Sequence, residues 1–130
     1  MKKGGRMKIP GQLLSLIEAR STQTIPPGIG ALSDAARRLH GDAVSAVLFY
    51  GSCLRSGNAG DGLVDLYLLV DDYHAAFGSR PLAFFNKLLP PNVFYLELPY
   101  QERLLRALFV VLTLDDFRKG TECWFHSYLW

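Results

Sequence analysis

The sequence predicts an α/β (α+β) fold, a mixed β-sheet with helices on one face. Two observations predict it. The expected elements run helix, helix, strand, loop, strand, helix, strand, strand, helix, so helices and strands are interspersed along one chain. Two of the expected strands, 43–50 and 63–70, are apolar almost throughout, which is typical of strands buried in the middle of a sheet. The 130 residues are enough for one domain with one core.

The first part of the chain predicts two helices. Residues 1–9 read as a tail, and residues 11–20 carry leucine and isoleucine at helical spacing. Residues 21–30 contain a Pro-Pro-Gly run and predict a loop. Apolar residues at helical spacing predict a second helix over 31–39, which ends at His40-Gly41.

The remaining elements surround the two apolar strands. Residues 51–62 are rich in Gly, Ser and Asn and predict an irregular loop or a short helical turn, and Asp71-Asp72 ends the second strand. Further along the chain, the patterns predict a helix at 80–89, strands at 93–98 and 106–113, and a final helical piece at 115–130.

The last residues, from Cys123 to Trp130, place four aromatic rings together. Such a cluster is rarely left exposed, so this piece either packs back on the sheet or leads into a further domain. We favour the second alternative. The chain then divides into 1–42, an N-terminal tail and helices; 43–118, the core of the domain; and 119–130, the start of a truncated C-terminal helical region.

Composition excludes several classes of protein. Hydrophobic residues make up 49% and charged residues 20%, which is globular composition. A net charge of +2 is too small to predict nucleic-acid binding. Cys53 and Cys123 lie far apart and form neither a metal-type pair nor a disulfide framework. No apolar run approaches the ~20 residues of a spanning helix, and no secretory signal is seen. We expect the two cysteines to be reduced thiols in a cytoplasmic protein.

The candidate chemistry lies between the two apolar strands. The first strand ends on Gly51-Ser52, Arg55 follows in the loop, and Asp65 is the acid within the second strand. Gly51 would let the backbone approach a ligand, while Ser52 and Arg55 would contact a phosphate. Asp65 shares a mixed strand face with Tyr67, so its carboxylate binds a cation, pairs with Arg55, or lies at the rim of the sheet.

These residues resemble the nucleotidyltransferase superfamily. Its pattern is an apolar strand, Gly-Ser, an Arg and a Gly, about a dozen residues, and then Asp-apolar-Asp; here Gly51, Ser52, Arg55 and Asp65 match it. The resemblance implies a mixed sheet backed by helices, a nucleotide triphosphate held by Gly51-Ser52, and Mg²⁺ bound by Asp65 as the catalytic metal ligand.

One position departs from that pattern. Tyr67 stands where the second acid of the pair is expected. Because Mg²⁺ is usually held by one or two carboxylates plus phosphates and waters, a further acid is needed or the site is degenerate. Glu97, in the strand at 93–98, is the best candidate for a second catalytic acid, and a solvent-facing role is its alternative. Asp71 shares the face of Asp65 but lies further along the strand.

A narrower resemblance covers residues 43–130. Tyr50-Gly51-Ser52, followed by Asp65 in a strand that runs into Asp71-Asp72, is similar to the mitochondrial-type phosphatidate cytidylyltransferases of the translocator assembly and maintenance family. The resemblance implies CTP and phosphatidic acid as substrates, CDP-diacylglycerol as product, and peripheral contact with the inner membrane. Leu108 departs from the family, which tends to carry a Lys before the aromatic residue of this strand.

Two rival functions remain open from the sequence. The chain is either a small nucleotidyltransferase that modifies protein or RNA, or a degenerate domain that binds nucleotide or a partner protein without catalysis. Tyr67 argues against the first rival, whose motif keeps the second acid. Tyr67 and Leu108 both favour the second.

Overall fold

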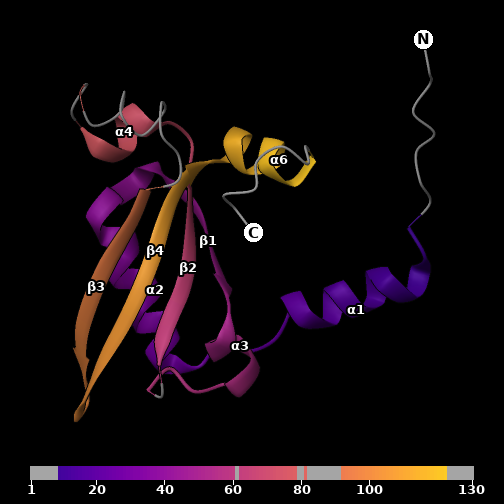
Figure 1. The fold of residues 1–130 in the computed structure, drawn as a ribbon, viewed down its shortest axis with the longest axis horizontal. Coiled ribbons are helices and arrows are strands. Elements are labelled where there is room, and N and C mark those ends of the chain that lie inside the picture. The colour runs from indigo at the N-terminus through magenta and orange to yellow at the C-terminus, as the bar shows by residue number, and fades with distance from the viewer. Residues whose placement is uncertain (1–8, 61, 79–80, 82–91, 123–130) are drawn as a thin grey trace.

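The computed structural model describes residues 9–60, 62–78, 81 and 92–122. It contains a mixed sheet with a long helix across one face, which confirms the predicted fold class (Figure 1). The elements are α1 (Gly11–Ser21), α2 (Pro27–His40), a 3-10 turn (Gly41–Ala43), β1 (Val44–Tyr50), α3 (Ser52–Ser56), β2 (Leu63–Val70), α4 (Tyr73–Phe77), β3 (Asn92–Tyr100), β4 (Arg103–Thr113) and α6 (Leu114–Glu122).

The four strands lie in the order β1-β2-β4-β3. β1 is antiparallel to β2, β2 is parallel to β4, and β3 forms an antiparallel hairpin with β4. The hairpin turns through Gln101, which has a positive φ of 54°. β2 and β4 are therefore the central strands, and their long apolar runs are explained by burial in the middle of the sheet.

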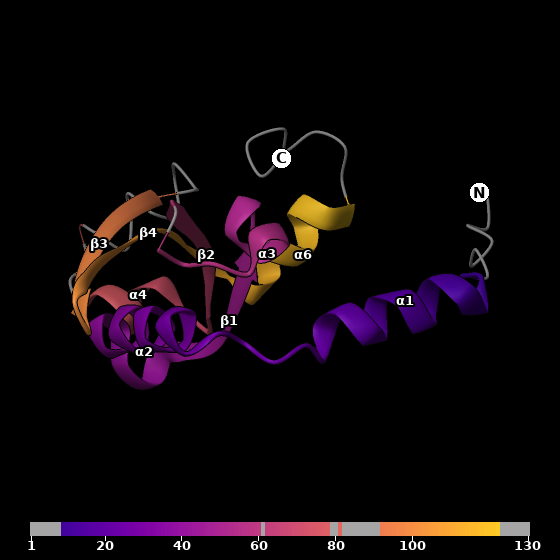
Figure 2. The same cartoon turned by 90° about the horizontal axis from the view of Figure 1, so that it is seen from below.

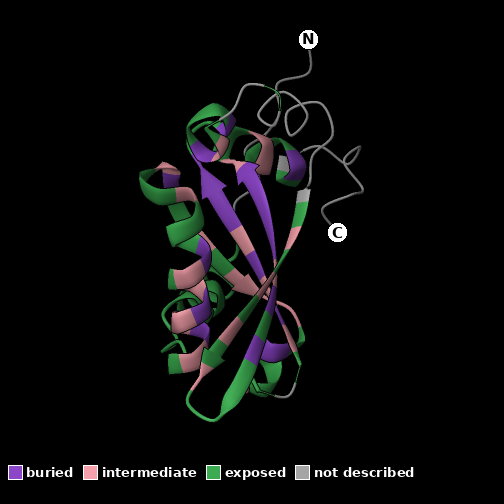
Figure 3. Ribbon diagram, turned by 90° about the vertical axis from the view of Figure 1, so that its left-hand side faces the viewer, coloured by how far each residue is buried: buried purple, intermediate pink, exposed green. Residues whose placement is uncertain are grey.

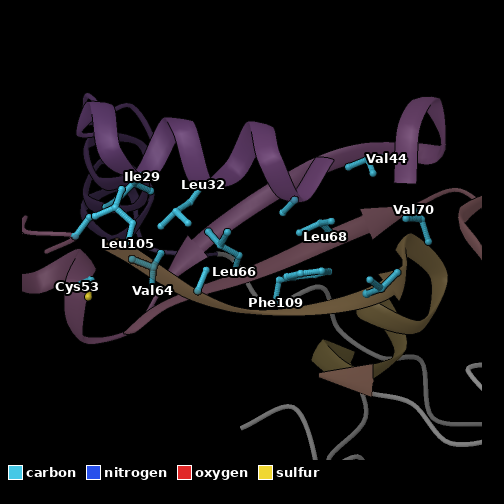
Figure 4. Close-up of a cluster of buried hydrophobic side chains, with 14 of the residues drawn as sticks. Ile29, Leu32, Val44, Cys53, Val64, Leu66, Leu68, Val70, Leu105 and Phe109 are labelled. Carbon is cyan, nitrogen blue, oxygen red and sulfur yellow. The ribbon is translucent and has the colours of Figure 1, made fainter. Parts of the chain in front are cut away.

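The main core lies between the sheet and α2 (Figure 4). Every second residue of β2 is fully buried on this face, as the alternation along the strand predicts. α2 faces them with Ile29, Leu32 and Ala36, each fully buried. Figure 3 shows the buried residues concentrated on the central strands and on the sheet-facing side of α2. The β2 residues of this core are Val64, Leu66, Leu68 and Val70.

Among the described residues, those that cover the opposite face of the sheet gather at one end. There α6 packs Phe117 against Tyr67, with ring centroids 5.8 Å apart, beside a small buried cluster of Leu69, Val110 and Leu112. α6 thus lies on the other side of the sheet from α2 (Figure 2). The expectation of helices on one face describes α2, while α6 adds a short second layer on the other face.

Two helices differ from the sequence prediction, α2 in where it begins and α4 in being present at all. α2 begins at Pro27, inside the predicted loop, because proline suits the first helical position and Gly28 lets the helix approach β4 closely. A Cβ added to Gly28 would lie 3.1 Å from Leu105 Cδ1. α4 was not predicted: the Asp72 carboxylate accepts a hydrogen bond from the Ala75 N–H at 3.1 Å, and Gly78 ends the helix with a φ of 62°.

The predicted helix at 11–20 is confirmed as α1, but none of its residues is buried. It extends away from the rest of the domain in two perpendicular views (Figures 1 and 2). The predicted helix at 80–89, apart from Pro81, and the predicted helical piece beyond Glu122 lie outside the described residues. In the part of the chain that is described, no helix combines the length and apolarity that a membrane span requires.

Candidate functional site

The structure brings Gly51 and Asp65 into direct contact. Tyr50, the last residue of β1, pairs with Asp65 across the antiparallel β1–β2 ladder, and Gly51 follows it with a φ of 87°. A Cβ added to Gly51 would overlap Asp65 Oδ2 and would lie 3.1 Å from its Cγ. Only glycine therefore lets the backbone turn away from β1 while the Asp65 carboxylate occupies this position.

The Asp65 carboxylate is half-buried and has no hydrogen bond or ion pair with any residue that the structure describes. Pairing with Arg55, one of the three alternatives left open by the sequence, is not among its contacts with the described residues. Desolvation by burial raises the pKa of Asp65 above its ordinary value. Such a carboxylate gains from a bound cation, because a nearby positive charge offsets the cost of its desolvation.

Two tyrosines stand beside the carboxylate. Tyr50 and Tyr67 stack with ring centroids 4.4 Å apart and an interplanar angle of 13°. Burial raises the pKa of the Tyr50 hydroxyl well above its usual range, and a side-chain hydrogen bond with Tyr67 and the Asp65 charge act in the same direction. Tyr50 therefore keeps its proton at neutral pH. The sequence singles out Tyr50 only within Tyr50-Gly51-Ser52, and its place opposite Asp65 follows from pairing the two strands.

Ser52 and Arg55 lie one helical turn apart on α3, and both are exposed. Residues at this spacing share a helix face, so the hydroxyl and the guanidinium can reach one ligand. Cys53 fixes the helix in place: it is 3% exposed, and its thiol donates a hydrogen bond to the Leu63 carbonyl oxygen at 3.3 Å. Its role here is to pack α3 against the start of β2.

Glu97 lies on the same sheet face as Asp65 but not beside it. β4 separates their strands, and Glu97 is level with Leu63, two residues along β2 from Asp65. Two strand spacings and this offset place the two acids roughly 12 Å apart. Glu97 also has other partners: it accepts a hydrogen bond from the Tyr95 hydroxyl at 2.5 Å and forms an ion pair with Arg106 at 3.7 Å. In the row of Asp65 itself, Leu108 of β4 is the paired residue and Tyr95 of β3 comes next.

Asp71 is engaged elsewhere. Its carboxylate accepts a hydrogen bond from the Ser45 hydroxyl, and its N–H donates to the Ala43 carbonyl oxygen at 3.1 Å. Asp71 thus secures the far end of the β1–β2 pair. Within the described ranges, no group of three or more His, Cys, Asp or Glu side chains is arranged to hold a metal ion. Asp65 is the one carboxylate that the described structure places against Gly51.

The site therefore offers one desolvated carboxylate, a glycine turn against it, a pair of stacked phenols, and a hydroxyl and a guanidinium on the adjoining helix. Such a set can bind a cation together with an anionic ligand. Searches of protein-family models, curated proteins and solved structures gave no significant match to this chain.

Proposed function

We propose that this chain is a nucleotidyltransferase-like domain that binds the triphosphate of a nucleotide at Gly51, Ser52 and Arg55, with Mg²⁺ beside Asp65. The contact between Gly51 and Asp65 carries the proposal. The sequence motif requires a strand-end glycine and a strand acid to serve one ligand. Their contact supports that reading, because residues from the ends of two different strands meet at one point.

A single carboxylate is enough for a metal ion whose other ligands are mainly phosphate oxygens of the nucleotide and waters. Mg²⁺ keeps several waters and is commonly bound by one or two carboxylates plus substrate phosphates. When bound, the ion would neutralise charge on the phosphates. The residues of the chain would then have separate tasks. The Asp65 carboxylate would bind the ion, and Gly51, which lacks a side chain, would leave space for that carboxylate. Arg55 would donate two parallel hydrogen bonds to phosphate oxygens.

The reaction we propose is cytidylyl transfer to phosphatidic acid. A phosphate oxygen of phosphatidic acid attacks the α-phosphorus of CTP, the bond to the β-phosphate breaks, and pyrophosphate leaves as CDP-diacylglycerol forms. Such a transfer needs alignment and charge neutralisation more than covalent help from the protein. With this acceptor, the domain would work at the surface of the inner membrane.

A nucleotide-binding domain without turnover is the second candidate. The separation of Glu97 from Asp65 and the presence of Tyr67 at the second-acid position favour it. The two candidates share nucleotide binding and differ in product formation. An assay for CDP-diacylglycerol from CTP and vesicles that contain phosphatidic acid therefore separates them.

Calorimetry with CTP and with ATP, in the presence and absence of Mg²⁺, tests the binding step. We expect Mg²⁺-dependent binding that prefers CTP and is reduced at least about tenfold by Asp65→Ala, which removes the anionic ligand of the ion. Asp34→Ala is the matched control, because it removes an exposed carboxylate from α2. If the unsubstituted chain binds neither nucleotide, both candidates are wrong.

A further inference from the structure

The sheet face opposite α2 is hollowed near the β3–β4 hairpin. We call this hollow the hairpin groove, and its volume is about 560 Å³. It lies on the β4 side of β2, whereas Ser52 and Arg55 follow β1 on the other side. Figure 1 shows the hairpin and α3 at the same end of the sheet. The groove is lined by Gly60 and Gly62 before β2, Leu63 on β2, Leu104 and Arg106 on β4, and Tyr95 on β3.

Arg106 is the charged residue that lines the groove, and it lies close to Asp65. It pairs with Leu63 across the parallel β2–β4 ladder, and Leu63 lies two residues from Asp65 on the same strand face. One strand spacing and this offset put the Cα atoms of Arg106 and Asp65 roughly 8 Å apart. An arginine side chain is long enough to present its guanidinium from this position to a ligand that also lies beside Asp65.

Glu97 contacts Arg106 without engaging all of its hydrogen-bond donors. Glu97 Oε1 lies 3.7 Å from Arg106 Nε and also accepts the hydrogen bond of the Tyr95 hydroxyl. The Arg106 side chain is 58% exposed, and beyond this ion pair it has no partner among the described residues. Because a guanidinium carries five N–H donors in a planar fork, its outer nitrogens can still bind a phosphate.

The rest of the groove is mostly apolar. Leu104, two residues from Arg106 on the same strand face, is 46% exposed, and Tyr95 is 55% exposed. Leu63 faces them from β2 and is partly exposed. One cation beside apolar side chains suits a ligand that has a phosphate at one end and hydrocarbon at the other, because a few polar groups orient a ligand in an otherwise apolar pocket.

We propose that the hairpin groove binds a lipid phosphate monoester, with its phosphate on Arg106 and the start of its acyl chains on Leu63 and Leu104. A phosphate monoester exposes three oxygens, of which the guanidinium fork binds two. The hydrocarbon next to the head group gains free energy when it covers the exposed leucines.

The role of this ligand as the acceptor rests on the proposed function. The lipid phosphate then reaches Asp65 from the β4 side, and the nucleotide phosphates, held by Ser52 and Arg55, reach it from the β1 side. The two reacting phosphates thus meet beside one carboxylate, each held by an arginine of its own. The binding of the lipid phosphate itself requires no nucleotide.

Calorimetry with dihexanoyl phosphatidic acid, kept below its critical micelle concentration, tests the groove in the absence of nucleotide. Glycerol 3-phosphate supplies the same phosphate monoester without acyl chains, and dihexanoyl phosphatidylcholine supplies the chains without a phosphate monoester. We expect phosphatidic acid to bind at least about tenfold more tightly than either of the others, because only this ligand uses both the guanidinium and the leucines.

Single substitutions then locate the site. Arg106→Gln should weaken the binding of dihexanoyl phosphatidic acid at least about tenfold, because it removes the guanidinium. Leu104→Thr, which replaces an exposed leucine by a polar residue that suits a strand, should weaken it as well and leave the affinity for glycerol 3-phosphate unchanged. Arg37→Gln is the matched control: it removes an exposed guanidinium from α2, on the other side of the sheet, and leaves the affinity for the lipid unchanged.

Three outcomes overturn the proposal. The first is an affinity for dihexanoyl phosphatidic acid that is absent in the wild type, or that is the same in the wild type and in a natively folded Arg106→Gln variant. The second is glycerol 3-phosphate binding as tightly as the lipid, because the acyl chains would then contribute nothing. The third is an equal loss of lipid binding and of Mg²⁺-dependent CTP binding in Arg106→Gln, because Arg106 would then belong to the nucleotide site.

The two proposals fail in different ways. A wild type that binds the lipid at Arg106 but does not bind CTP supports the groove and contradicts the proposed function. A wild type that binds CTP with Mg²⁺ but does not bind the lipid contradicts the groove alone.

Discussion

At the scale of single residues, the meeting of Gly51 and Asp65 couples backbone conformation to the candidate site. Two effects oppose a side chain at Gly51: its φ of 87° and the overlap with the Asp65 carboxylate. Gly57, which ends α3 with a φ of 67°, has nothing within 4 Å of an added Cβ. A side chain at Gly57 would therefore add conformational strain alone, whereas a side chain at Gly51 would add both strain and steric overlap.

We expect Gly51→Ala to lower the free energy of unfolding by about 2–4 kcal/mol, and Gly57→Ala by about 1 kcal/mol, because only the first adds a clash to the strain. Urea denaturation of both variants measures this difference. In an Asp65→Ala background the penalty for Gly51→Ala should shrink, since Oδ2 and Cγ are gone. Equal penalties in the two backgrounds would contradict the contact.

The ionised Asp65 carboxylate should lower stability at neutral pH. Burial raises its pKa in the folded state above the value of about 3.9 in unfolded chains. The folded protein is therefore relatively more stable at low pH, where Asp65 is protonated in both states, and it loses that advantage as the pH rises through the folded pKa.

Asp65→Asn should accordingly stabilise the protein near pH 7, by no more than about 1 kcal/mol because solvent screens a half-buried group. The gain should disappear below about pH 4, where the wild-type carboxyl is neutral as well. Denaturation of the wild type, Asp65→Asn and the exposed control Asp34→Asn at several pH values measures this. A gain that grows as the pH falls would show that the sign is wrong.

At the scale of secondary structure, α2 holds the sheet through one face. Leu32 is fully buried against the central strands, whereas Leu39, on the same helix, is 60% exposed. His40 closes the end of the helix. Its Nδ1–H donates a hydrogen bond to the Ala76 carbonyl oxygen of α4 at 2.9 Å, and its ring meets the ring of Phe77 edge-on, with centroids 5.2 Å apart. The helix is thereby joined both to the core and to α4.

Leu32→Ala should cost about 2–5 kcal/mol of unfolding free energy, because it removes buried methyl groups and leaves a cavity under α2. Leu39→Ala makes the same chemical change at the surface and should cost less than about 0.5 kcal/mol. Thermal and urea unfolding of the pair provide the test. Similar losses for the two leucines would mean that α2 does not cover the sheet in the orientation described.

Some helices and strands were predictable from the sequence and others were not. The strands were predictable because their apolar runs reflect burial directly, as in β2. The start of α2 was missed because Pro27 and Gly28 signal a loop equally well until Leu105 is known to lie against the glycine. α4 was missed because its five residues depend on the Asp72 cap and not on an apolar period.

The candidate site likewise has a part that the sequence predicts and a part that it does not. Gly51 and Asp65 are close in sequence and lie on adjacent strands, so a local motif was enough to predict that they meet. The distance of Glu97 could not be predicted, because it depends on β4 lying between β2 and β3. Strand order is set by how the whole chain buries its apolar faces, so a local sequence pattern does not predict it.

At the scale of the whole molecule, the described residues form one layered body from α2 to α6, with α1 outside it. Leu13, Leu14, Leu16 and Ile17 are each between 46% and 57% exposed, and no residue of α1 is buried. An isolated helix of 11 residues is marginally stable in water, because few hydrogen bonds offset the cost of nucleation. The sheet and α2 should therefore unfold as one cooperative unit to which α1 contributes little.

Removal of residues 1–21 should change the free energy of unfolding by less than about 0.5 kcal/mol, because no buried contact is lost. The midpoint and steepness of urea unfolding, followed by far-ultraviolet circular dichroism, should match those of the full chain, and only the native helical signal should fall slightly. A clear loss of stability would instead mean that the apolar side of α1 packs on the domain. A loss that appears only at high concentration of the full chain would place α1 between two copies, since association makes stability depend on concentration.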